Sequence, residues 1–216
     1  MEDLCRDLLR KAACGFLVQG HVHNMSGPLQ ILSMQVELMK TLFERIPQAD
    51  PTKTAAFIQD QQKKLDQIAS QVERLRALLA SISEVTEELP TTLDLNEVLQ
   101  KELVFWEGDL VFKHEVPKEL DLSPEPLLFY ASPAAINQGL CALFWGFIPA
   151  LSENRGSLRV TTEKQARGPK ATISLTGIEL VPDNPFFEIA SELLSPYGKV
   201  VLQPQTISLE FQKSEP

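Results

Sequence analysis

Cysteine is scarce in this sequence, and its scarcity excludes two classes of site. The three cysteines are Cys5, Cys14 and Cys141, and no two of them form a Cys-x-x-Cys pair. A disulfide framework or a cysteine-based metal site is therefore not expected. Cys14 and Cys141 lie among apolar residues, which predicts reduced thiols in the core.

Basic residues are also in the minority, because 20 lysines and arginines stand against 29 aspartates and glutamates and leave a net charge of -9. Nucleic-acid binding depends on neutralising phosphates, so a nucleic-acid partner is not expected. No basic cluster favours a membrane surface, and apolar runs such as residues 140–151 are shorter than a membrane-spanning helix. The first residues lack the shape of a signal peptide. We expect a cytoplasmic protein without a membrane partner.

An apolar heptad rhythm is the main pattern of the first part of the chain. Its spacings of four and three predict one continuous helix over residues 2–46, with a local kink because Pro28 lies inside it. The rhythm is carried by Val18, Val22, Met25, Leu29, Leu32, Val36, Met39, Phe43 and Ile46. A second such run predicts a helix over residues 52–87, after a turn with two prolines at 47–51.

Two long helices joined by a short loop are expected to pack as an antiparallel hairpin. A single hairpin of this length leaves much of its apolar stripe in water. A second copy of the chain would cover this stripe most simply, which predicts a homodimer with a four-helix bundle.

The character of the sequence changes after Leu89-Pro90, which predicts two domains, 1–88 and 89–216. Asp94 and Glu97 form a capping box that opens a helix reaching about Trp106. The following pattern predicts extended segments at 110–116, 127–131, 158–162 and 171–175, helices at 133–151 and 185–194, and a hairpin of 199–202 with 206–211. The second domain is therefore expected to be an α/β sandwich, and the whole chain α+β.

His23 is the residue with the strongest chemical interest. In the heptad it falls on the face turned away from the apolar seam, and Gly27, one turn further, leaves the imidazole little steric cover. An imidazole in the open on a rigid helix can act as a nucleophile. His21 falls beside the seam, where packing or a hydrogen bond is its natural role. The alternative for His23 alone is an ordinary surface histidine.

The segment from His23 to Leu29 resembles the H-box of two-component sensor histidine kinases, in which a phosphorylated histidine precedes Pro-Leu by five positions. The resemblance implies that the hairpin is a dimerisation and histidine-phosphotransfer domain. It also implies that residues 89–216 have the architecture of the kinase ATP-binding domain.

The nucleotide site departs from that family at three places. Gly146 and Pro149 stand where active kinases have a magnesium-binding asparagine and a glutamate base. Thr176 stands near the position of the adenine-binding aspartate, and a glycine-poor segment at 183–187 replaces the phosphate loop. Without glycines the backbone cannot approach phosphates closely. The resemblance therefore implies a degenerate domain, and we expect no ATP, other cofactor or metal to be bound.

The H-box departs as well. Asn24 follows the histidine where kinases place Glu or Asp, and an amide can orient the imidazole but cannot take its proton at neutral pH. Gly27 offers no side chain to position water. Both changes weaken catalysis by the chain itself, but neither prevents His23 from receiving a phosphoryl group.

The favoured interpretation is a histidine phosphotransferase of bacterial type, with His23 as phospho-acceptor and a response-regulator receiver domain as partner. The predicted partner-binding residues are Gly27, Pro28, Gln30 and Met34 on the first helix. A second interpretation is a non-catalytic pseudokinase-type binding module that regulates a response regulator or a histidine kinase. A third is an active ATP-dependent kinase, which the degenerate motifs disfavour.

Overall fold

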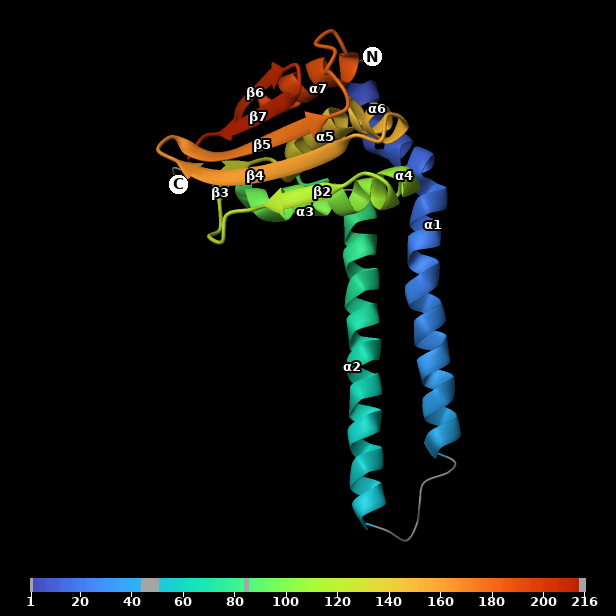
Figure 1. The fold of residues 1–216 in the computed structure, drawn as a ribbon. Helices are drawn as coiled ribbons and strands as arrows, with labels where there is room; N and C mark the ends of the chain where they lie inside the picture. The colour runs from blue at the N-terminus through green and yellow to red at the C-terminus, as the bar shows by residue number, and fades with distance from the viewer. Residues whose placement is uncertain (1, 44–50, 84–85, 214–216) are drawn as a thin grey trace.

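Two long helices form an antiparallel hairpin that projects from a sheet-containing domain (Figure 1). The computed structural model describes residues 2–43, 51–83 and 86–213. Helix α1 (Glu2–Phe43) runs through Pro28 without interruption, which confirms the predicted continuous helix. Its predicted last residues, 44–46, lie outside the described residues, as does most of the predicted turn at 47–51.

The second helix of the hairpin, α2 (Pro51–Ile82), is shorter than the predicted span of 52–87. Residues 86–88 belong to no helix. The carbonyl oxygen of Glu87 accepts a hydrogen bond of 3.0 Å from the backbone N–H of Ala134, in helix α5 (Pro133–Trp145). This contact joins the chain after α2 to the sheet domain. The spacing of apolar residues within one helix cannot predict such a contact.

The remaining described chain combines helices and strands, which confirms the predicted α+β class. Its five-stranded sheet has the order β2-β4-β5-β7-β6, in which only the β2–β4 pair is parallel, and β1 pairs with β3 separately. In chain order the elements besides α5 are β1 (Thr91–Asp94), α3 (Leu95–Trp106), α4 (Leu110–His114), β2 (Lys118–Asp121), β3 (Leu128–Ala131), α6 (Ile148–Glu153), β4 (Ser157–Gln165), β5 (Gly168–Thr176), α7 (Pro185–Leu194), β6 (Gly198–Gln203) and β7 (Thr206–Phe211).

The hydrophobic core joins α3, α5 and α7 to the inner face of β4, β5 and β7. Trp106, Phe144 and Phe147 are fully buried in it, whereas Trp145 is only partly buried. Cys141 is buried in this core, and its burial raises the pKa of the thiol. The segment 133–153 has the length and apolar composition of a membrane span, but 61% of that window is buried inside the fold.

Two predicted elements are wrong in detail. Residues 110–116 were expected to be extended, but α4 forms there because the Asp109 carboxylate accepts hydrogen bonds from the N–H groups of Val111 and Phe112, at 2.9 and 3.0 Å. The predicted helix at 133–151 is divided, because α5 ends at Trp145 and α6 begins at Ile148. Strands β1 and β2, of four residues each, were not predicted.

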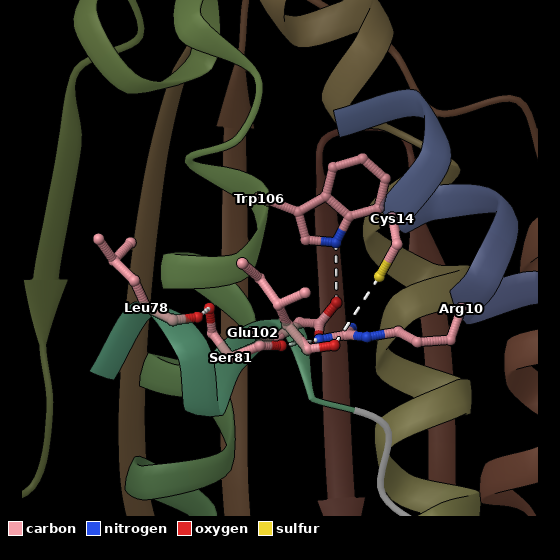
Figure 2. A network of polar contacts seen from close by, with 7 residues as sticks. Arg10, Cys14, Leu78, Ser81, Glu102 and Trp106 are labelled. Carbon is pink, nitrogen blue, oxygen red and sulfur yellow. Dashed lines mark hydrogen bonds and ion pairs between the residues drawn. The ribbon is translucent and has the colours of Figure 1, made fainter. Parts of the chain in front are cut away.

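A buried polar network joins the hairpin to the sheet domain (Figure 2). Arg10 of α1 lies 2.6 Å from the Glu102 carboxylate of α3 and donates a second hydrogen bond of 2.7 Å to the carbonyl oxygen of Ser81 in α2. The indole N–H of Trp106 donates to the other Glu102 oxygen at 2.8 Å. Burial raises the pKa of the Glu102 carboxyl, and the charge of Arg10 acts against that rise. Helices α1, α2 and α3 therefore meet at the guanidinium group of Arg10.

A close backbone approach makes a second connection between the two parts. Gly20 of α1 faces Gly108, in the turn between α3 and α4, so closely that a Cβ added at Gly20 would lie 1.7 Å from the Gly108 carbonyl oxygen. Helix α1 is thus seated directly on the α3–α4 turn. This seating decides which side of the H-box segment is covered.

Candidate functional site

The seating of α1 gives different exposure to three side chains in and next to the H-box-like segment. His21 and Asn24 are buried, with 3% and 4% of their surface exposed, whereas His23 is exposed. Successive residues turn by about 100° around a helix, so His23 points between the covered side of Asn24 and the open side of Val22. The prediction that the imidazole of His23 has little cover agrees with this placement.

Asn24 is held by the sheet domain. Its amide nitrogen donates to the carbonyl oxygen of Glu107 at 2.8 Å, and its amide oxygen accepts from the ammonium group of Lys113 at 2.5 Å. Both ends of the side chain are thus engaged by the α3–α4 turn and by α4. The predicted role of Asn24 as an orienter of His23 stays a prediction, and the contacts described here give it a second role as an anchor.

The predicted partner-binding residues divide into two groups. Gly27, Gln30 and Met34 are exposed and follow His23 at helical positions that share its face. Pro28 is buried, so its ring offers little surface for contact with a partner. Whether these residues contact a receiver domain stays a prediction.

His23 opens onto a hollow of about 200 Å³ between the hairpin and the sheet domain. Helix α2 contributes Arg74 to its wall, and α4 contributes Lys113 and His114. The full lining is His23, Asn24, Gly27, Pro28, Ile31, Arg74, Lys113 and His114. No aspartate or glutamate lines this hollow in the described part of the chain.

The three basic residues of this hollow were not recognised as site residues from the sequence. His114 lies in the segment 110–116, which the sequence predicts to be extended, so the sequence gives no reason to place it beside His23. The signal that could have corrected this is Asp109, a strong N-cap residue, followed by Lys113 and His114 in the last turn of a short helix. For Arg74 no local signal exists.

His21 lies on the other side of α1, in the contact with the sheet domain. Its ring centre is 5.3 Å from that of Phe105, and its edge faces Gly108. Among the described residues neither ring nitrogen has a hydrogen-bond partner. Burial, and to a lesser extent the charge of Arg10, lowers the pKa of this imidazole. The predicted packing role of His21 agrees with this position.

The lowered pKa of His21 makes the stability of the fold depend on pH. The unfolded chain binds a proton at the ordinary histidine pKa of about 6.5, and the folded chain resists it. Stability should therefore fall as the pH drops from 7.5 to 5.5. His21→Leu should show a smaller loss over that interval in urea unfolding, because no buried imidazole remains to be charged. An equal loss in parent and variant would contradict a buried neutral His21.

Gly146, Asn184 and Thr176 each contact other residues of this chain. A Cβ at Gly146 would lie 2.3 Å from the ring of Phe187, so this ring packs directly on the end of α5. The Asn184 amide donates to the carbonyl oxygen of Gly146 at 3.1 Å. The hydroxyl of Thr176 is 2.6 Å from that of Ser157 on the neighbouring strand. These contacts are internal to the fold, and the expectation that no nucleotide binds stays a prediction.

Metal-binding groups are dispersed over the described residues. No three histidine, cysteine, aspartate or glutamate side chains gather there in a way that could hold a metal ion.

No family model matches this sequence, and no curated protein matches it either. Among solved structures, the fold is similar to the Acinetobacter baumannii histidine kinase AdeS, with a TM-score of 0.47 and 16% identity over 89% of this chain and 98% of that chain. It is similar to the histidine kinase ThkA in complex with the response regulator protein TrrA, with a TM-score of 0.49 and 18% identity over 99% of this chain and 65% of that chain. It is also similar to a bacterial phosphotransferase, with a TM-score of 0.37 and 12% identity over 92% of this chain and 94% of that chain. These are likenesses of fold at low identity, and the function proposed below rests on the chain's own residues.

Proposed function

We propose that this chain is a cytoplasmic histidine phosphotransferase that relays phosphoryl groups to or from response-regulator receiver domains through His23. The observation that carries the proposal is the exposure of His23 on a continuous helix, between the buried His21 and Asn24, within an H-box-like sequence. A nucleophile presented on a rigid element, with its neighbours fixed, is suited to group transfer.

The proposed step needs only one group from this chain. The lone pair of an imidazole nitrogen forms a bond to the phosphorus of an aspartyl phosphate on the receiver. The bond between phosphorus and the carboxylate oxygen breaks, its electron pair returns to the carboxylate, and the ring releases a proton to water. The reverse sequence passes the phosphoryl group to another receiver. The metal ion and acidic pocket for such a transfer belong to the receiver in this proposal.

Transfer without ATP is part of the proposal. The packing of Phe187 against Gly146, and the hydrogen bond from Asn184 to the same residue, support it because they leave the end of α5 covered. Calorimetric titration with ATP and magnesium should give no heat of binding. Micromolar affinity would favour an ATP-dependent kinase and would contradict this part of the proposal.

The direct test is to incubate the protein with phosphorylated receivers and to look for acid-labile, base-stable phosphate on His23. The parent should be labelled, and His23→Gln should lose the label completely. The variant should unfold at the parent's midpoint, because the His23 side chain is exposed. If no receiver of the same organism labels the parent, the proposal fails.

The non-catalytic binding module remains the competing function, and a cellular assay separates the two. A phosphotransferase should lose its effect with His23→Ala. A binding module should keep its effect with that variant and lose it when the exposed Gln30 and Met34 are changed. The second result would replace the proposed function.

We propose also that two chains pair through their hairpins, because α1 leaves an apolar stripe in water. Val22, Leu29, Val36 and Phe43 repeat every seven residues, and each is between 42% and 55% exposed. Such a stripe is typical of a helical interface. It lies about 100° around the helix from His23, so pairing would leave the imidazole accessible.

Light scattering tests the pairing directly. The parent should show twice the chain mass of 24.1 kDa at micromolar concentration. Leu29→Glu combined with Val36→Glu should give the mass of one chain, because two charges would be buried in the interface. A parent mass of one chain would contradict the pairing.

A further inference from the structure

The hollow beside His23 has an unusual charge for this chain. The protein carries a net charge of -9, yet the wall of the hollow holds Arg74, Lys113 and His114 and, among the described residues, no carboxylate. Within the same residues, no ion pair ties Arg74 or Lys113 to an acid. Uncompensated basic groups around one cavity create a local positive potential that attracts anions.

We propose that this hollow is the binding site for the phosphoryl group of phosphorylated His23, with Arg74, Lys113 and His114 as its ligands. The inference rests on the proposed function and names the residues that hold the transferred group. A phosphoryl group offers charged oxygen acceptors, and guanidinium and ammonium groups are their strongest partners in proteins. The sheet domain then supplies two of the three ligands, which gives a domain without nucleotide chemistry a direct part in phosphotransfer.

Lys113 shows how the two domains cooperate at this site. Its ammonium group donates to the amide oxygen of Asn24 at 2.5 Å, next in sequence to the phospho-acceptor. The same amide donates to the carbonyl oxygen of Glu107, which fixes the side chain against the α3–α4 turn. The neutral amide thus holds the ammonium group beside His23 without cancelling its charge. A carboxylate at this position would pair with Lys113 and remove the charge from the hollow.

Arg74 contributes from the opposite wall. It lies on α2, is exposed, and reaches the hollow across the hairpin. Arg76, two residues further, is also exposed but pairs with Glu73 at 2.8 Å and does not line the hollow. The two arginines therefore form a matched pair on one helix, one at the site and one away from it.

The test uses potassium phosphoramidate, a small anionic donor that needs no partner protein. An imidazole nitrogen of His23 forms the new bond to phosphorus, and ammonia leaves with the electron pair of the old bond and takes up a proton. Diethylpyrocarbonate, an uncharged electrophile, is used in parallel on the same variants. It reports the exposure and nucleophilicity of His23, which a merely structural change would alter. Site-resolved mass spectrometry, with His23→Gln as a blank, separates His23 from the other histidines.

Lys113→Gln and Arg74→Gln should each slow phosphorylation of His23 by phosphoramidate about tenfold, and raised salt should reduce the difference. Their reaction with diethylpyrocarbonate should stay at the parent rate. Arg76→Gln should match the parent with both reagents. Equal phosphoramidate rates in all variants would overturn the inference, and so would a parallel loss with both reagents. If the Lys113 and Arg74 variants react more slowly with phosphoramidate but no receiver labels His23, the phosphoryl site is supported and the proposed function fails. If receivers label His23 but the variants react at the parent rate, only the phosphoryl site fails.

Discussion

Arg10→Met should lower the free energy of unfolding by about 3–5 kcal/mol, the usual loss when one partner of a buried ion pair is removed. Glu102 is 1% exposed, so its carboxylate would stay buried with only the Trp106 indole as a donor. The Ser81 carbonyl oxygen would lose its partner as well. Urea unfolding of parent and variant measures the difference.

The cost should come from the unpaired charge and not from the pair itself. Arg10→Met combined with Glu102→Leu should therefore recover most of the lost stability, because no buried charge remains. Arg76→Met is the control, since its partner Glu73 is exposed, and it should change stability by less than about 1 kcal/mol. A loss of that small size for Arg10→Met would show that the network does not hold the hairpin on the sheet domain.

The same network connects the hairpin to the sheet domain. Arg10, Ser81 and Glu102 belong to three helices, and the hydrogen bonds between them fix the position of α1 along the sheet domain. About four turns further along α1, Asn24 contacts Glu107 and Lys113. The position of His23 relative to Lys113 therefore depends on contacts distributed along the helix.

Features that depend on local pattern could be predicted from the sequence. The heptad rhythm gives the continuous α1 through Pro28, and Asp94 begins α3 by accepting the N–H of Asn96 at 3.0 Å. The exposure of His23 and the packing of His21 also follow from their heptad positions. These features need only the periodicity of one helix.

Features that depend on contacts between distant segments could not be predicted. The basic wall of the hollow joins His23 to Arg74 and Lys113, which are far apart in the chain and share no motif. The burial of Asn24 follows from the docking of α1 on the sheet domain, and heptad position alone does not specify such docking. The hydrogen bond between Glu87 and Ala134, after the end of α2, is another contact between segments far apart in the chain.

Gly20→Ala should be strongly destabilising, although alanine is normally favoured over glycine inside a helix. The added Cβ would lie 1.7 Å from the carbonyl oxygen of Gly108, a backbone atom that cannot rotate away. Helix α1 must then shift off the α3–α4 turn, and we expect a loss of about 3 kcal/mol, at the upper end of overpacking costs. Chemical unfolding measures it.

Gly15→Ala on the same helix is the matched control, because no atom lies within 4 Å of its added Cβ. It should stabilise the fold by roughly 0.5–1 kcal/mol through the lower flexibility of the unfolded chain. Gly20→Ala should in addition slow the phosphoramidate reaction of His23 while its reaction with diethylpyrocarbonate continues, since the shift carries the imidazole away from Lys113 and leaves it exposed. A stabilised Gly20→Ala variant would show that α1 is not seated on Gly108. The sheet domain would then have no fixed place beside His23, and the basic hollow could not act as one site.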